Sequence, residues 1–179
     1  MMRKALLLAV AALSAASLAA CEIRVGPDEG RSPRELDVDT PLGDLTVRGD
    51  AVPSDVGVAV YPGARPLEDG HETERANVYL SSPFVDLRVA ALKYLSDDQP
   101  DAIAEFYRKE LSAYGPVTLC RGDLDFDRDA APRCKSGRGG RGQLQVGVGS
   151  KGNFRLASVK PRGTGSEFAV VYVRASNDR

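Results

Sequence analysis

The sequence predicts an α+β protein: an antiparallel β-sheet with one amphipathic helix packed on one face, plus a small N-terminal β-hairpin. Three observations lead to this prediction. Short runs of alternating apolar and polar residues recur along the chain, as in half-buried strands. Glycine-containing turns separate the later runs, which favours antiparallel pairing of successive strands. One segment, residues 98–114, has the spacing of an amphipathic helix.

The first 20 residues have the features of an export signal. Arg3 and Lys4 precede an apolar run, residues 5–20, which only Ser14 and Ser17 interrupt. This run is shorter than the about 20 apolar residues that a transmembrane helix needs. A positive start, a short apolar run and small residues at its end are typical of a secretory signal peptide.

The signal ends in Leu18-Ala19-Ala20-Cys21, which resembles the lipobox of bacterial lipoproteins. The resemblance implies that the Cys21 thiol receives a diacylglycerol and that the chain is cut just before this residue. Two or three acyl chains, at about 0.8 kcal/mol per buried CH₂, give stable membrane anchoring. Residue 22 is Glu rather than the Asp that retains some lipoproteins in the inner membrane, so the resemblance favours the outer membrane in a Gram-negative host. The alternative is a buried core cysteine.

The other two cysteines, Cys120 and Cys134, are expected to form a structural disulfide, because thiols outside the cytoplasm oxidise. In the chain-entropy model, closing a loop of about 15 residues is worth roughly 3 kcal/mol. The chain has no CxxC redox motif. Two thiols acting as metal ligands would need neighbouring His or Cys, which are absent from this stretch.

Residues 21–34, after the signal, read as the lipidated cysteine and a flexible tether, rich in charge, Gly and Pro. Residues 35–50 alternate on both sides of Pro41-Leu42-Gly43, which predicts the hairpin. Ten strand residues are not stable alone in water, so the hairpin must dock on the main domain or on another molecule.

An α+β domain is expected over residues 51–175. Residues 56–61 form at most a short edge strand, because Pro62-Gly63 makes a turn. The best strand is in residues 85–95, with Val85, Leu87, Val89 and Ala91 on one face. The helix over 98–114 has Asp98 as a cap and Pro100 in its first turn. Further strands are expected at residues 76–81, 117–120, 143–148, 154–159 and 168–174. The helix covers one face of the sheet, and the other faces solvent or a partner.

The composition marks no nucleic-acid-binding protein, because 24 basic and 25 acidic residues leave a net charge of −1. Residues 137–142, Gly-Arg-Gly-Gly-Arg-Gly, resemble RNA-binding RGG segments but lack interleaved aromatic residues. We expect no nucleic-acid partner.

Four alternating carboxylates within the Cys120–Cys134 loop are weak candidates for a calcium site: Asp123, Asp125, Asp127 and Asp129. The stretch departs from the EF-hand pattern, since Arg128 stands at the turn glycine and Cys134 at the bidentate glutamate. We therefore expect a solvated acidic loop without a metal, and no cofactor.

The motifs of catalysis are largely missing. Gly147-Val148-Gly149-Ser150-Lys151-Gly152 matches G-x-G-x-x-G, but the next residues alternate like a strand, so the glycines serve a hairpin rather than a dinucleotide site. His71 is the only histidine, and no G-x-S-x-G elbow accompanies it. We expect a protein that is not an enzyme.

Two stretches are similar to uncharacterised bacterial envelope lipoproteins: the turn Tyr61-Pro62-Gly63-Ala64, and the F-Y-x-x-x-L motif of the helix, residues 106–111. The resemblance implies a fold and carries no activity or site residues.

We expect a lipid-anchored, non-enzymatic binding or structural module of the cell envelope. Its expected partner is a protein, a glycan or peptidoglycan, and it contacts the membrane through the lipid on Cys21. One alternative is an extracytoplasmic hydrolase that uses dispersed carboxylates such as Asp86 or Glu105. The other is a small-ligand carrier with an apolar cavity under the helix.

Overall fold

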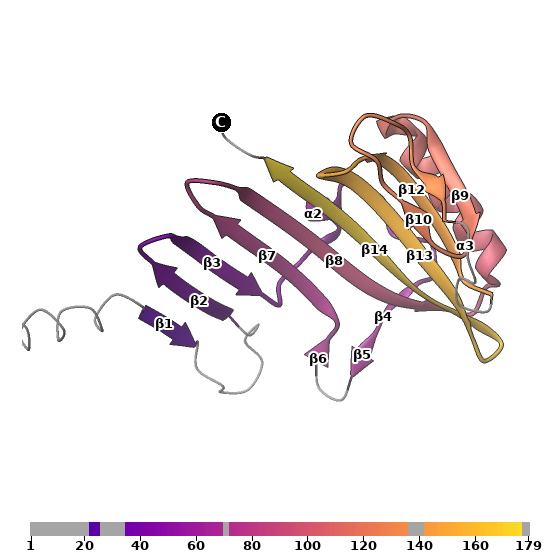
Figure 1. Ribbon diagram of the computed structural model, residues 1–179. Coiled ribbons are helices and arrows are strands. Elements are labelled where there is room, and N and C mark those ends of the chain that lie inside the picture. Colours follow the sequence, from indigo (N-terminus) through magenta and orange to yellow (C-terminus); the bar gives the residue numbers. More distant parts are fainter. Residues whose placement is uncertain (1–21, 26–34, 70–71, 136–141, 177–179) are drawn as a thin grey trace, which may run out of the picture.

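One large antiparallel sheet contains most strands of the described residues (Figure 1). The computed structural model describes residues 22–25, 35–69, 72–135 and 142–176. In spatial order the strands are β1 (Glu22–Val25), β2 (Glu35–Thr40), β3 (Gly43–Arg48), β7 (Arg75–Ser81), β8 (Asp86–Ser96), β14 (Gly165–Ser176), β13 (Asn153–Arg162), β12 (Leu144–Ser150) and β9 (Val117–Arg121). The two-residue strand β4 (Arg65–Pro66) pairs with the far end of β8.

The helices lie on one side of this sheet (Figure 1). The main helix is α3 (Pro100–Leu111), continued by the 3₁₀ turn η2 (Ser112–Tyr114), and α2 (Pro53–Val56) is a single turn. Ile103, Tyr107 and Leu111 of α3 and Val56 of α2 join one core with the inward side chains of four strands. Each of these four side chains is fully buried. The predicted antiparallel sheet with one amphipathic helix on one face is therefore confirmed.

The expected cap of the main helix is wrong. Gln99, in extended conformation, precedes Pro100 and makes no side-chain capping bond. The Asp98 carboxylate instead accepts a hydrogen bond of 2.8 Å from the Tyr61 hydroxyl. Pro100 lies in the first turn as expected, where its missing N–H costs no helical bond.

No strand forms at residues 56–61, where we expected at most a short edge strand. Residues 53–56 form α2, which ends at Gly57 in a left-handed conformation with φ of 76°. Pro53 at the start of a helical turn supplies a suitable φ, and Asp55 accepts a hydrogen bond from the Val52 N–H. Local turn chemistry therefore outweighs the alternation of valines at positions 56, 58 and 60.

Glu22–Val25, which we expected to belong to the tether, forms β1 and pairs with β2. The β2–β3 pair in turn joins the main sheet through β7, with Val47 opposite Val78. The hairpin of β2 and β3 therefore docks on the main sheet of the same chain.

Two small ribbons lie outside the main sheet. One pairs β5 (Glu68–Asp69) with β6 (Glu72–Thr73), and the other pairs β10 (Leu124–Asp125) with β11 (Arg133–Cys134). The second ribbon belongs to the loop between β9 and β12, which folds back over the face of the sheet opposite α3.

Candidate functional site: an open apolar face of the sheet

The face of the sheet opposite the helices is apolar across most of its width. Directly opposed residues of neighbouring strands share a face, so the strand register defines rows of side chains across the sheet. One row contains Leu36, Val47, Val78, Val89, Val173 and Phe154. The row nearer the hairpin turns contains Val38, Leu45, Leu80, Leu87 and Ala175, and the row on the other side contains Ala76, Ala91, Val171 and Leu156. We call these three rows the open face.

No element among the described residues covers most of the open face. Its side chains are all half-buried, and none belongs to the hydrophobic core. The exception is the loop with β10 and β11, where the Phe126 ring stacks on Phe154 with ring centroids 4.1 Å apart. The loop covers the part of the open face that β12 and β13 form, but not the part that β2, β3, β7 and β8 form.

The glycines of the G-x-G-x-x-G match explain how this loop packs. A Cβ on Gly147 would lie 2.7 Å from Leu124 Cδ1 and 2.8 Å from Phe126 Cζ, so only glycine lets both side chains approach the strand. Gly149 has φ of 101° where β12 turns into β13. The prediction that these glycines serve a hairpin is confirmed.

The open face becomes charged toward the other end of the strands. In the next rows Lys93 pairs with Glu74, and Lys160 pairs with Glu167 at 2.8 Å. Burial acts to raise the pKa of Glu167, but the hydrogen bond from Lys160 and the charges of Lys160, Arg162 and Lys93 outweigh it, so that pKa is lowered. Only a small hollow of about 250 Å³ lies here.

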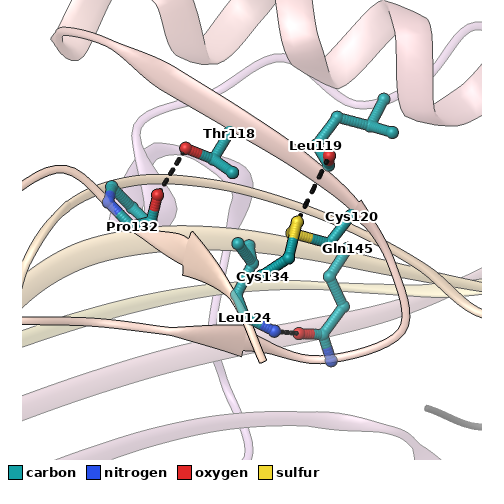
Figure 2. The surroundings of a disulfide bond; sticks show 7 residues. All are labelled: Thr118, Leu119, Cys120, Leu124, Pro132, Cys134 and Gln145. Atoms are coloured by element: carbon teal, nitrogen blue, oxygen red, sulfur yellow. Dashed lines mark hydrogen bonds between the residues drawn. A yellow bond between two sulfur atoms is a disulfide. The ribbon is translucent and has the colours of Figure 1, made fainter. Parts of the chain in front are cut away.

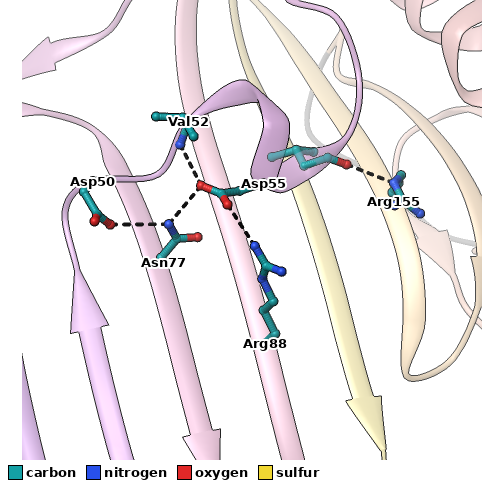
Figure 3. Close-up of polar contacts among 7 residues, drawn as sticks. Asp50, Val52, Asp55, Asn77, Arg88 and Arg155 are labelled. Carbon is teal, nitrogen blue, oxygen red and sulfur yellow. Dashed lines mark hydrogen bonds and ion pairs between the residues drawn. The ribbon is translucent and has the colours of Figure 1, made fainter.

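On the helix side, the same N-terminal strands carry polar groups. Thr46 and Asp37 share a row with Tyr79 and Arg88. The Asp55 carboxylate of α2 forms an ion pair with Arg88 at 2.8 Å and accepts a 3.1 Å hydrogen bond from the Asn77 amide (Figure 3). The Val52 N–H, the Asn77 amide and the Arg88 guanidinium hold the pKa of Asp55 below its ordinary value, although burial acts to raise it. The N-terminal part of the sheet is therefore amphipathic.

Two large apolar side chains project from neighbouring turns. Leu42, in the β2–β3 turn, is 71% exposed, and Phe84, in the β7–β8 turn, is 72% exposed. The Ser82 hydroxyl accepts hydrogen bonds from the N–H groups of Phe84 and Val85 and donates one to the Val85 carbonyl, which fixes the second turn.

The expected disulfide between Cys120 and Cys134 is present, with the two Cα atoms 5.5 Å apart. It joins β9 to β11 and so fixes the covering loop to the sheet (Figure 2). Two hydrogen bonds add to this attachment, from Thr118 Oγ1 to the Pro132 carbonyl at 2.6 Å and from the Leu124 N–H to Gln145 Oε1 at 2.7 Å. Cys21 lies outside the described residues.

The four candidate calcium ligands do not converge. Asp127 pairs with Arg133 at 2.8 Å, and Asp123 accepts a 3.4 Å hydrogen bond from Gln145. Across the part of the chain that the structure describes, no three His, Cys, Asp or Glu side chains form a group that could hold a metal ion. The Arg133–Asp127 pair brings a basic and an acidic side chain of this loop together.

The two carboxylates considered for hydrolysis are not brought together. Asp86 accepts a hydrogen bond from Ser81 beside the β7–β8 turn, and Glu105 pairs with Arg108 on the exposed side of α3. The Arg108 hydrogen bond lowers the pKa of Glu105. A general acid needs a raised pKa, so this arrangement does not suit acid–base chemistry.

The space between α3 and the sheet is filled by side chains. Tyr107, Phe168, Ile103 and Leu111 are each at most 1% exposed. An open hollow of about 550 Å³ lies elsewhere, between Tyr114, Arg128 and Arg155. Arg155 is committed to structure there, because it donates to the Val56 carbonyl at 2.9 Å and lies over the Tyr114 ring. Neither place provides the apolar cavity that the carrier hypothesis requires.

Comparison with known proteins adds no assignment: no protein-family model, curated protein or solved structure matches this chain. No family or structural neighbour therefore indicates catalysis. Within the described residues, no helix is long and apolar enough to cross a membrane. The open face, which none of the sequence motifs indicates, is the candidate site. The sequence feature that indicates it is the placement of apolar residues at every second position of β2, β3, β7 and β8.

Proposed function

We propose that this chain is a lipid-anchored, non-enzymatic protein of the cell envelope that acts as a binding module, with the open face as its binding surface. The open face is the observation that carries the proposal. Exposed apolar patches of this breadth mark sites of association on soluble domains. The half-buried side chains of three rows lie on a rigid sheet, so a partner finds them already in place.

The anchor in this proposal is a lipid on Cys21. Its support is the positively charged, apolar and lipobox-like beginning of the sequence. The export that this implies agrees with the Cys120–Cys134 disulfide, because such bonds persist outside the cytoplasm. In a Gram-negative host we propose that the protein faces the periplasm from the outer membrane.

The small N-terminal hairpin belongs to the same proposal. Leu36 and Val38 of β2 and Leu45 and Val47 of β3 contribute to the open face. Residues 35–50 therefore widen the binding surface on the side where the chain leaves for its anchor. The hydrolase alternative has no supporting geometry in the candidate site.

Carbene footprinting of the full-length lipoprotein tests the proposal. A photoactivated diazirine labels exposed side chains, once in intact envelopes and once in the purified, detergent-released protein. We expect peptides from β3, β7 and β8 to be labelled less in the envelope, because the open face is covered there. The outward side of α3, with Glu105 and Arg108, provides the internal control and keeps its labelling.

Equal labelling of the open-face peptides in both preparations would contradict the binding role. Intact-mass analysis of the same purified product reads the anchor independently. An acylated chain that begins at Cys21 supports the anchoring, and an unmodified chain that begins at an initiator methionine overturns it.

A further inference from the structure

We propose that the partner of the open face is the lipid bilayer itself, and that the side chains of Leu42 and Phe84 enter this bilayer. The inference rests on the proposed anchoring at Cys21 and names the occupant of the same surface. Four observations carry it: the position of the anchor, the two exposed turns, the polarity along the open face and the polarity across the sheet.

The anchor and the two turns lie at the same end of the sheet. Glu22, the residue after Cys21, pairs with Asp39 next to the β2–β3 turn. That turn adjoins the β7–β8 turn, because Asp44 is opposite Ser81. Figure 1 shows the start of β1 and both turns along one margin of the sheet. A lipid on Cys21 therefore holds this margin close to the membrane.

The turns present apolar side chains beyond the strands. Leu42 and Phe84 are the two most exposed of the large apolar side chains in the described residues, whereas Val52, Tyr114 and Leu119 are 39–43% exposed. The three hydrogen bonds of Ser82 hold the Phe84 turn in its outward conformation. Exposed apolar side chains on an ordered turn lose contact with water when they enter the acyl boundary of a membrane.

The open face continues this apolar surface and then ends in charge. The apolar rows lie next to the turns, and the row with Lys93 follows about 20 Å beyond Leu87, since each strand residue advances about 3.3 Å. Peripheral amphipathic elements sink about 5–10 Å into the boundary between headgroups and acyl chains. The rows nearest the turns can therefore contact acyl chains while the Lys93–Glu74 and Lys160–Glu167 pairs stay in water.

The polarity across the sheet sets its tilt. Asp39, Asp44 and Asp86 lie at the same margin but in a row on the helix side. A sheet that entered the bilayer upright would carry these carboxylates with it, at a high desolvation cost. The sheet therefore leans with its open face toward the bilayer and these carboxylates toward water. These acidic groups favour a zwitterionic lipid surface over an anionic one.

A second copy of the chain is the competing occupant. Two open faces packed against each other would bury the three rows equally well. That arrangement gives no role to the projecting Leu42 and Phe84, and it does not explain why the apolar rows gather at the anchored margin. We therefore assign the surface to the bilayer.

The chain contains no tryptophan, so a single introduced tryptophan reports its own environment. We would prepare Leu42→Trp, Phe84→Trp and Val78→Trp in the full-length lipidated protein, together with Leu119→Trp as the matched control. Leu119 is 39% exposed on β9, the strand at the opposite edge of the sheet. Each protein is reconstituted in phosphatidylcholine vesicles, with and without bromine on the acyl chains.

We expect blue-shifted emission and quenching by brominated lipid at positions 42 and 84, weaker quenching at 78, and none at 119. Absence of quenching at both turns overturns the inference. So does a blue shift that depends on protein concentration without quenching, which identifies a second copy as the occupant. Intact mass separates the two levels: an acylated but unquenched protein refutes only the bilayer contact, whereas an unacylated chain refutes the proposed anchoring.

Discussion

The same strands form both faces of the sheet, but the chain's helices cover only one of them. Along β8, Ala90 and Leu92 lie on the helix side, belong to the core and are at most 3% exposed, whereas Leu87 and Val89 face the other way and are half-buried. The covered face obtains its stability from the chain's own helices. The open face retains apolar surface that the described elements leave in contact with solvent. Strand alternation therefore determines which side a residue takes, and the distribution of helices decides which side becomes core.

The largest difference between the two faces is expected for truncations within β14. Phe168→Ala should lower the free energy of unfolding by about 3–5 kcal/mol, because Phe168 is 1% exposed and its removal leaves a cavity. Val173→Ala on the open face of the same strand should cost about 1 kcal/mol or less, since solvent already reaches this side chain. Urea unfolding monitored by circular dichroism measures both changes. Similar costs would show that the open face is also a packed interior.

The disulfide tests the covering of the open face by the loop with β10 and β11. Cys120→Ala combined with Cys134→Ala should lower the free energy of unfolding by about 3 kcal/mol, because the bond closes a loop between residues 14 apart in sequence. Reduction of the unaltered protein should give the same loss. Unfolding in guanidinium with and without reductant provides the measurement. A protein indifferent to reductant would contradict the expected role of the bond.

The Asp55 network marks where the helix side changes from core to polar surface. The pKa of the Asp55 carboxyl lies below its ordinary value of 3.8, so the ionised form stabilises the fold fully above that pH. This contribution is lost as the pH falls through the lower pKa of the folded protein. Asp55→Asn should cost about 2 kcal/mol at pH 7, because the amide has no charge and only one acceptor oxygen for the Val52 N–H and the Arg88 guanidinium.

The pH series supplies the control for this variant. The stability difference between Asp55→Asn and the unaltered protein should shrink as the pH falls from 7 toward 3. A difference that stays constant across this range would show that the carboxylate charge is not the stabilising group.

The smallest effect is expected at the centre of the open face. Val78→Thr adds a hydroxyl to a half-buried side chain, so the change in the free energy of unfolding should be within about 0.5 kcal/mol. Val170→Thr, at 2% exposure on the covered face, should cost about 1–3 kcal/mol because the new hydroxyl is buried. Thermal unfolding of both variants sharpens the comparison. A large loss for Val78→Thr would place another covering element over the open face.

Local sequence patterns predicted most elements but not their spatial order. The stripe of Ile103, Tyr107 and Leu111 identified α3, and Pro and Gly positions identified the hairpin turns. The patterns missed β1, because four residues carry too little periodicity, and they missed α2, because a single turn depends on tertiary contacts.

The sequence predicted that the sheet face opposite the helix meets solvent or a partner, but not which strands share that face. The apolar residues of β8 change from odd to even positions along the strand. Leu87 and Val89 lie on one face, whereas Leu92 and Tyr94 lie on the other. This change indicates that two different surfaces meet along one strand. The position of β14 beside β8 was needed to see which strands share each surface, and no local pattern encodes that pairing.

The place of β14 also determines how the two halves of the sheet are joined. β14, the last of the described strands, lies between β8 and β13, in the middle of the sheet. Among the described strands, β1 to β8 and β9 to β13 are joined by backbone pairing only through β14, residues 165–176. A variant that lacks residues 165–176 should therefore fail to form this sheet, because it lacks the strand that joins the two halves.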